Sequence, residues 1–166
     1  MKRGNIYLVG FMGAGKTSVG MRLAELLRWD FVDLDQRIEE REGRSIREIF
    51  SVEGEAYFRD REREELARAA LKRQIVVALG GGAFVDDRNR ETIALSGTSI
   101  WLDATMDTLY PRCADDPSRP LVAARGEMEQ LLERRRPYYE QAALRIEVDG
   151  RTVDDLARSI VRRLAL

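Results

Sequence analysis

Short apolar runs alternate along the chain with longer stretches in which apolar residues recur at helical spacing. The short runs predict five strands, at residues 5–9, 31–32, 75–79, 99–102 and 145–148. The longer stretches predict a helix that begins near Gly15, followed by helices over residues 36–42, 45–50, 55–72, 89–95, 127–143 and 153–164. Strands that alternate with helices in this way are typical of an α/β domain, in which helices cover both faces of a parallel sheet.

The loop between the first strand and the first helix carries the strongest motif. Residues Gly10 to Thr17 fit the pattern G-x-x-x-x-G-K-[ST], in which backbone N–H groups and a helix N-terminus cradle phosphates. Lys16 can reach the β- and γ-phosphates, and the Thr17 hydroxyl can ligate Mg²⁺. A chance glycine turn is the simpler alternative, but the strand before the motif and the helix after it favour a nucleotide site. Its predicted phosphate contacts are Gly13, Ala14, Gly15, Lys16, Thr17 and Ser18.

Two aspartates, Asp33 and Asp35, directly follow the second strand. The carboxyl ends of parallel strands are where open α/β sheets bind their ligands. If the strand continued through both residues, their i, i+2 spacing would place them on one face. The alternative is that one of them only caps the following helix, which Gly43 ends.

Three glycines, residues 80–82, follow the apolar strand over residues 75–79. They allow a ligand to approach the backbone closely and offer N–H donors, although a flexible turn would have the same composition. The charged residues of the preceding helix, such as Arg61 and Glu65, are spaced like solvent-exposed i, i+4 pairs. On this pattern alone, Arg59 is more typical of a surface arginine than of a ligand.

Residues 112–125 have the composition of a lid, because prolines interrupt the segment and Arg112, Arg119 and Arg125 give it positive charge. An arginine on a closing loop can neutralise a transferring phosphoryl group. For Arg119, this interpretation and that of an ordinary surface loop remain equally open. We expect Pro111 to disturb the helix before the lid and Pro137 to kink the later helix or start a new segment.

The composition limits the possible chemistry. The chain of 166 residues, with a net charge of −1, is predicted to form one domain without affinity for nucleic acid or membrane. It has no histidine and one cysteine, Cys113, so the common general base and zinc sites are excluded. Carboxylates, arginines and one loop lysine suit phosphoryl transfer, in which charge stabilisation does most of the catalysis. No signal peptide or long apolar run is evident, so we expect a cytoplasmic monomer.

Together these features resemble the shikimate kinase family of P-loop kinases, related to the nucleoside monophosphate kinases. The resemblance covers nearly the whole chain. It rests on Gly10 to Thr17, Asp33-Leu34-Asp35, Gly43-Arg44-Ser45-Ile46, Phe58-Arg59, Gly80-Gly81-Gly82-Ala83, Arg119-Pro120-Leu121 and Arg135-x-Pro137-x-Tyr139. It implies one P-loop kinase domain over residues 1–166 with a five-stranded parallel sheet in the order 2-3-1-4-5, a substrate-binding helical region near residues 34–62 and a lid near residues 112–125.

The resemblance also implies roles for individual residues. The family transfers the γ-phosphoryl group of ATP to the 3-hydroxyl of shikimate, with Mg²⁺, in the chorismate pathway of aromatic amino-acid biosynthesis. By this resemblance, Thr17 and Asp33 bind the metal, and Asp35, Lys16 and Arg119 are catalytic. The acid is held by Asp35, Arg59, Arg135 and the backbone at Gly80, Gly81 and Gly82, and the nucleotide also contacts Arg112, Arg119 and Arg151.

Other functions stay open at this point. A gluconate kinase or a nucleoside monophosphate kinase would share the phosphate loop, whereas a GTP switch lacks its Asn-Lys-x-Asp signature in this sequence. A non-catalytic nucleotide-binding domain would lack some catalytic residue type. Arginines beside Asp35 are expected to lower the pKa of this carboxyl, which would make it a weak base. Asp115 and Asp116 would oppose phosphate binding unless they point outward, and Leu34 is expected to point away from the site.

Overall fold

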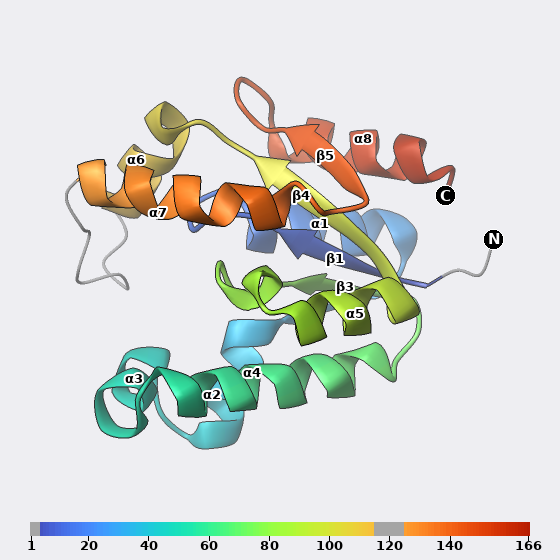
Figure 1. Cartoon of the computed structure of the whole chain (residues 1–166). Coiled ribbons are helices and arrows are strands. Elements are labelled where there is room, and N and C mark those ends of the chain that lie inside the picture. Colours follow the sequence, from blue (N-terminus) through green and yellow to red (C-terminus); the bar gives the residue numbers. More distant parts are fainter. Residues whose placement is uncertain (1–3, 115–124) are drawn as a thin grey trace.

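The computed structural model describes residues 4–114 and 125–166 and contains a five-stranded parallel sheet in the order β2-β3-β1-β4-β5 (Figure 1). The strands are β1 (Asn5–Val9), β2 (Asp30–Asp33), β3 (Ile75–Ala78), β4 (Gly97–Asp103) and β5 (Leu144–Glu147). In the centre, Ile6 of β1 is in register with Val76 of β3 and Thr98 of β4. The predicted sheet and strand order are therefore confirmed.

Helices cover both faces of the sheet (Figure 1). α1 and α8 pack against each other on one face, and α4, α5 and α7 lie on the other. The helical elements are α1 (Lys16–Leu27), α2 (Leu34–Glu42), α3 (Ile46–Glu53), α4 (Glu55–Ala70), the 3₁₀ turn η1 (Ala83–Val85), α5 (Asp87–Ser96), α6 (Met106–Ala114), α7 (Arg125–Tyr139) and α8 (Val153–Leu164).

The apolar strands form the core because helices bury both of their faces. Every residue of β1 and β3 is buried, as expected for central strands of a parallel sheet. The largest buried side chains include Trp101, Tyr7 and Tyr139. At Gly20, a Cβ would lie 2.5 Å from the Phe31 ring, so glycine lets α1 approach β2 closely.

A second, smaller apolar cluster lies outside the main core. Ile38, Ile49 and Phe58 come from α2, α3 and α4, and Ile46 and Tyr57 pack against them partly buried. This cluster joins the three helices into one unit beside the sheet. The unit includes the range near residues 34–62 in which we expected the substrate-binding helices.

Two prolines lie inside helices without ending them, so Pro137 does not start a new segment. Pro111 lies inside α6 and Pro137 inside α7. A helical proline leaves the carbonyl four residues earlier without its N–H donor. Those carbonyls belong to Asp107 and Glu133, which are both exposed, so water can satisfy them.

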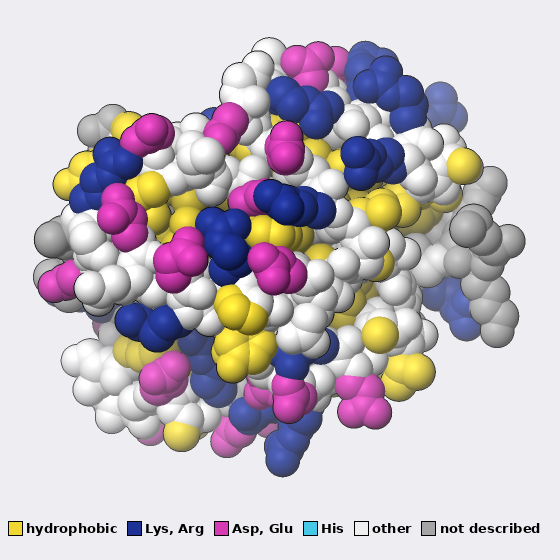
Figure 2. Space-filling view, turned by 45° about the horizontal axis from the view of Figure 1, so that its top comes forward, with side chains coloured by type: hydrophobic (Ala, Val, Ile, Leu, Met, Phe, Trp, Pro, Cys, Tyr) yellow, Lys and Arg dark blue, Asp and Glu magenta, His cyan; other side chains and the backbone are white. Residues whose placement is uncertain are grey.

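The surface mixes both signs of charge. Figure 2 shows arginine and lysine side chains interspersed with acidic ones over the visible face, in line with a net charge of −1. Within the part of the chain that the structure describes, no helix is both long and apolar enough to cross a membrane.

Candidate active site

The phosphate loop lies between β1 and α1, at the carboxyl end of the central strand. Gly13 and Gly15 have φ angles of 82° and 96°, a backbone conformation that favours glycine. The Lys16 Nζ donates hydrogen bonds to the Gly10 carbonyl at 2.7 Å and the Phe11 carbonyl at 2.9 Å, so its ammonium group lies over the loop. The motif therefore adopts the strand–loop–helix arrangement that was predicted.

A cavity of about 350 Å³ opens beside this loop. Its lining residues are Gly13, Gly15, Lys16, Thr17, Ser18, Arg112 and Val153. All predicted phosphate-loop contacts line it except Ala14, whose side chain is buried in the core. The loop therefore presents its glycines and polar side chains to one space.

Arg112 and Arg151, which were both expected to contact the nucleotide, differ in position. The Arg112 Nη1 donates to the Gly13 carbonyl at 3.0 Å, so α6 brings this side chain to the cavity although Pro111 precedes it. The Arg151 guanidinium instead donates to the carbonyls of Glu147 and Asp155, and it is not among the residues that line the cavity. Arg119, Asp115 and Asp116 lie outside the described residues, as does most of the expected lid.

Thr17, in the first turn of α1, contacts Asp33, the residue before α2. The Thr17 hydroxyl donates to Asp33 Oδ2 at 2.9 Å, and Asp33 Oδ1 accepts from the Gln36 N–H at 3.1 Å. Asp33 therefore caps α2, which was one of the alternatives drawn from the sequence, and its other carboxylate oxygen is bonded to the phosphate loop. A hydroxyl and a carboxylate side by side form the hard oxygen donor set that suits Mg²⁺.

A second cavity, of about 520 Å³, contains all of the residues that were predicted to hold the acid. Lys16, Thr17 and Asp33 line it together with Asp35, Arg59, Arg135 and Gly80, Gly81 and Gly82. Arg135 comes from α7, and its guanidinium lies 5.7 Å from the centre of the Phe11 ring. Segments far apart in the sequence thus converge opposite the phosphate loop.

Asp35 is half-buried in this cavity, with its Oδ1 atom shielded from solvent, and it lies in the first turn of α2 rather than on a strand as the i, i+2 spacing suggested. Its Oδ1 accepts no hydrogen bond from the described residues. Burial raises the pKa of Asp35 from 3.8 to about 6, the neighbouring Asp33 adds to this rise, and Lys16 opposes it. Our expectation of a lowered pKa was therefore wrong, because desolvation outweighs the nearby cations.

Arg59 is held between two carboxylates of its own helix, α4. Its Nη1 lies 2.8 Å from Glu62 Oε1, and its Nε lies 3.5 Å from Glu55 Oε1. Glu62 is fully buried, and burial raises its pKa from 4.5 to about 7 against the opposing effect of Arg59. Arg59 also lowers the pKa of Asp35, but less than Lys16 does.

Glu62 is a site residue that we did not predict. It lines the cavity, and its Oε2 has no hydrogen-bond partner within the described ranges. A signal was present in the sequence, since Phe58, Glu62 and Leu66 follow one another at i, i+4 and all three are buried. A glutamate inside an apolar helical stripe is unusual and indicates a partner or a ligand.

Each glycine of the triplet lies against a different side chain of the cavity. A Cβ on Gly80 would lie 2.7 Å from Asp35 Oδ1, and one on Gly81 would lie 3.0 Å from Arg135 Nη1. On Gly82 it would lie 2.5 Å from Arg59 Nη2. The triplet therefore forms a packed wall, and a side chain at any of its three positions would displace the end of a neighbouring polar side chain.

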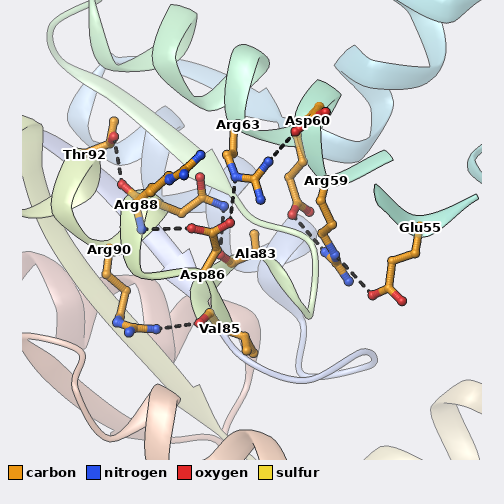
Figure 3. A network of polar contacts seen from close by, with 12 residues as sticks. Glu55, Arg59, Asp60, Arg63, Ala83, Val85, Asp86, Arg88, Arg90 and Thr92 are labelled. Atoms are coloured by element: carbon orange, nitrogen blue, oxygen red, sulfur yellow. Dashed lines mark hydrogen bonds and ion pairs between the residues drawn. The ribbon is translucent and has the colours of Figure 1, made fainter. Parts of the chain in front are cut away.

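Ion pairs hold this wall against α4 (Figure 3). The Arg63 Nε donates to Asp86 Oδ2 at 2.7 Å, and Asp86 Oδ1 accepts from the Arg88 N–H at 2.8 Å. The Arg90 Nη1 donates to the carbonyls of Phe84 and Val85 at 2.7 and 2.8 Å. These contacts fix the turn that follows Gly82, and with it the distance between Gly82 and Arg59.

Comparison with known proteins agrees with this arrangement. Residues 12–165 match the family model described as shikimate kinase. A shikimate kinase of Persephonella marina is 44% identical over 161 residues, which are 96% of this chain and 98% of that protein. A solved structure of the shikimate kinase from Acinetobacter baumannii in complex with shikimate has a TM-score of 0.93 and 38% identity, and the match covers 98% of this chain and 93% of the other.

A gluconokinase from Sinorhizobium meliloti shares only the fold. Its structure matches with a TM-score of 0.60 and 19% identity, over 98% of this chain and 92% of the other. The alternative of a gluconate kinase is therefore much more distant than the relatives above. The chain belongs to the shikimate kinase family.

Proposed function

We propose that the chain transfers the γ-phosphoryl group of ATP to the 3-hydroxyl of shikimate, giving shikimate 3-phosphate and ADP in chorismate biosynthesis. Family membership makes it an ATP-dependent phosphotransferase that uses Mg²⁺. The observation that carries the proposal is the cavity in which Asp35, Arg59 and Arg135 face Lys16. A small hydroxy acid held there would have its hydroxyl next to a phosphate bound by the loop.

Arg59 and Arg135 are proposed to bind the acid carboxylate. They reach the cavity from different helices and lie against neighbouring glycines, Gly82 and Gly81. Guanidinium groups bind carboxylates through paired hydrogen bonds, which fix orientation as well as charge. Glu62 holds one end of the Arg59 guanidinium, so the Nη2 atom remains to meet the acid.

Lys16, Thr17 and Asp33 are proposed to serve the phosphate end. Lys16 exchanges its contacts with the loop carbonyls for the β- and γ-phosphates when the nucleotide binds. Thr17 and Asp33 hold Mg²⁺, which when bound neutralises charge on the phosphate oxygens. The glycine N–H groups from Gly13 onward complete the cradle.

Asp35 is proposed as the base. The oxygen of the shikimate 3-hydroxyl forms a bond to the γ-phosphorus, and the bond from that phosphorus to the leaving ADP oxygen breaks. The proton of the 3-hydroxyl passes to the Asp35 carboxylate. With a pKa of about 6, most Asp35 carboxylates are ionised at neutral pH and still basic enough to accept a proton. Burial thus tunes Asp35 toward the operating pH rather than away from it.

The nucleotide contacts of Arg112, Arg119 and Arg151 remain part of the proposal, with Arg119 acting on the phosphates from the lid. We also propose that residues 1–166 act as one domain and as a cytoplasmic monomer. Light scattering after gel filtration should then give a mass near 19.0 kDa.

A coupled ADP-release assay with shikimate, quinate and gluconate tests the proposed substrate. Turnover should depend on Mg²⁺ and be fastest with shikimate. The Asp35→Asn variant, measured alongside, should retain binding of the acid but lose most of the turnover. Turnover with gluconate and none with shikimate would overturn the assignment.

A further inference from the structure

Tyr139, the last residue of α7, is not among the residues that line the cavity, yet it contacts the wall of that cavity. Its side chain is fully buried, and its hydroxyl donates a hydrogen bond to the Gly81 carbonyl at 2.5 Å. A bond of this length is at the short end of the range for O–H donors, so the contact is close. The hydroxyl therefore fixes where the middle glycine of the triplet lies.

This contact also orients the next peptide group. The described part of the chain has no cis peptide bonds, so the Gly82 N–H points opposite to the Gly81 carbonyl. Because Tyr139 binds that carbonyl, the Gly82 N–H faces away from Tyr139. Gly82 itself lines the cavity, so rotation of this peptide would change which polar group the wall presents.

The same tyrosine lies beside the proposed carboxylate ligand. Arg135 and Tyr139 are spaced i, i+4 on α7, so both side chains leave the same face of the helix. Both also arrive at Gly81, since a Cβ there would lie 3.0 Å from Arg135 Nη1. Burial raises the pKa of the Tyr139 hydroxyl, and Arg135 is the largest influence that opposes this rise, which places the two groups in electrostatic contact.

The ring of Tyr139 rests on the sheet. Its centre lies 6.0 Å from that of Trp101 in β4, with an angle of 36° between the rings. Trp101 is itself almost fully buried, so the position of the hydroxyl is set by the core and not by α7 alone. The contact thus links the rigid sheet to the wall of the acid cavity.

We propose that Tyr139 is a positioning residue for the acid-binding half of the reaction. Its hydroxyl holds the peptide between Gly81 and Gly82 in one orientation, at the glycine against which the Arg135 guanidinium lies. The inference rests on the proposed role of Arg135 in binding the carboxylate. Tyr139 itself contacts neither the acid nor ATP in this proposal.

The Tyr139→Phe variant tests this, because it removes the hydroxyl and leaves the ring on Trp101. We expect the KM for shikimate to rise by about three- to tenfold, the range that loss of one hydrogen bond gives, while the KM for ATP stays within about twofold. Calorimetric titration of shikimate should show the same factor in Kd, which keeps the test available if turnover becomes too slow to measure.

Tyr7→Phe is the matched control. Tyr7 is equally buried, and its hydroxyl lies 2.6 Å from Ser96 Oγ, with no role in either cavity. This variant should lower the melting temperature about as much as Tyr139→Phe does, without changing either KM. A similar loss of stability in both variants, with a changed shikimate KM only in Tyr139→Phe, separates positioning from folding.

Two results would overturn the inference: a shikimate KM and Kd within twofold of the wild type in Tyr139→Phe, or equal increases in the KM for shikimate and for ATP. Arg135→Ala in the same series separates this inference from the function on which it rests. If Arg135→Ala weakens shikimate binding and Tyr139→Phe does not, only the role of Tyr139 fails. If neither variant weakens it, the proposed role of Arg135 fails as well.

Discussion

A single methyl group added at Gly82 should disable the acid site without unfolding the protein. The Cβ of an alanine would lie 2.5, 2.9 and 3.0 Å from the Nη2, Nη1 and Cζ atoms of Arg59. Since ordinary contacts are near 3.5 Å, the guanidinium would have to retreat by roughly 1 Å. The φ angle of Gly82 is −98°, which alanine adopts readily, so the backbone itself is not strained.

We expect that move to weaken the present ion pairs of Arg59. Its Nη1 is 2.8 Å from Glu62, and its Nε is 3.5 Å from Glu55. A displacement of about 1 Å at a substrate-positioning group can cost about 100-fold in rate. For Gly82→Ala we therefore expect kcat/KM for shikimate to fall by about 10- to 100-fold, with little change in the KM for ATP.

Steady-state kinetics with each substrate varied in turn, together with a thermal melt, measure these quantities. Gly126→Ala is the control, because Gly126 lies in α7 and the Cβ of an alanine there would meet no other group within 4 Å. That change should leave the shikimate KM unaltered and raise stability by up to about 1 kcal/mol, as alanine does in a helix. If Gly82→Ala binds and phosphorylates shikimate like the wild type, the inference that glycine is needed to seat Arg59 is refuted.

Three further predictions follow from the site. Asp35→Asn should lower kcat by about 100-fold or more, whereas a near-normal kcat would remove Asp35 from proton transfer. Asp35 must be ionised to act, and its pKa is about 6. In the wild type, kcat/KM should therefore fall about tenfold for each pH unit by which the pH is lowered below 6. The pKa of Glu62 is about 7 in the folded state against an ordinary value of 4.5, so between pH 4.5 and 7 the folded state binds more protons than the unfolded state. The free energy of unfolding should therefore fall as the pH rises from 4.5 to 7. Urea titrations at several pH values should show this fall, and the fall should be smaller in the Glu62→Gln variant.

Much of the fold could be predicted because its signals are local. The strand–loop–helix at Lys16, the buried runs of β1 and β3, and the cap before α2 are each written within a few residues of sequence. The prolines show the limit of local rules. Pro111 was expected to disturb its helix and Pro137 to kink its helix or start a new segment, but both helices continue past their proline, and the residues four positions earlier, Asp107 and Glu133, are exposed.

The electrostatics of the site could not be predicted in the same way. Charged residues on α4 looked like solvent-exposed pairs, yet Glu65 is buried and pairs with Arg41 of α2 and with Arg68. The pKa of Asp35 was assigned the wrong direction because desolvation, which depends on the folded arrangement, outweighs the nearby cations. Burial and long-range pairing decide both results, and neither has a fixed spacing along the chain.

The glycine triplet shows why residue type alone could not distinguish a ligand loop from a flexible turn. Asp35 reaches Gly80 from α2, Arg135 reaches Gly81 from α7, and Arg59 reaches Gly82 from α4. Three helices thus use consecutive positions of one backbone segment as a template that sets the spacing of their functional groups. Since that segment continues the buried strand β3, the spacing of the three functional groups depends on the core of the protein. A side chain introduced at Gly80, Gly81 or Gly82 should therefore disturb Asp35, Arg135 or Arg59, respectively.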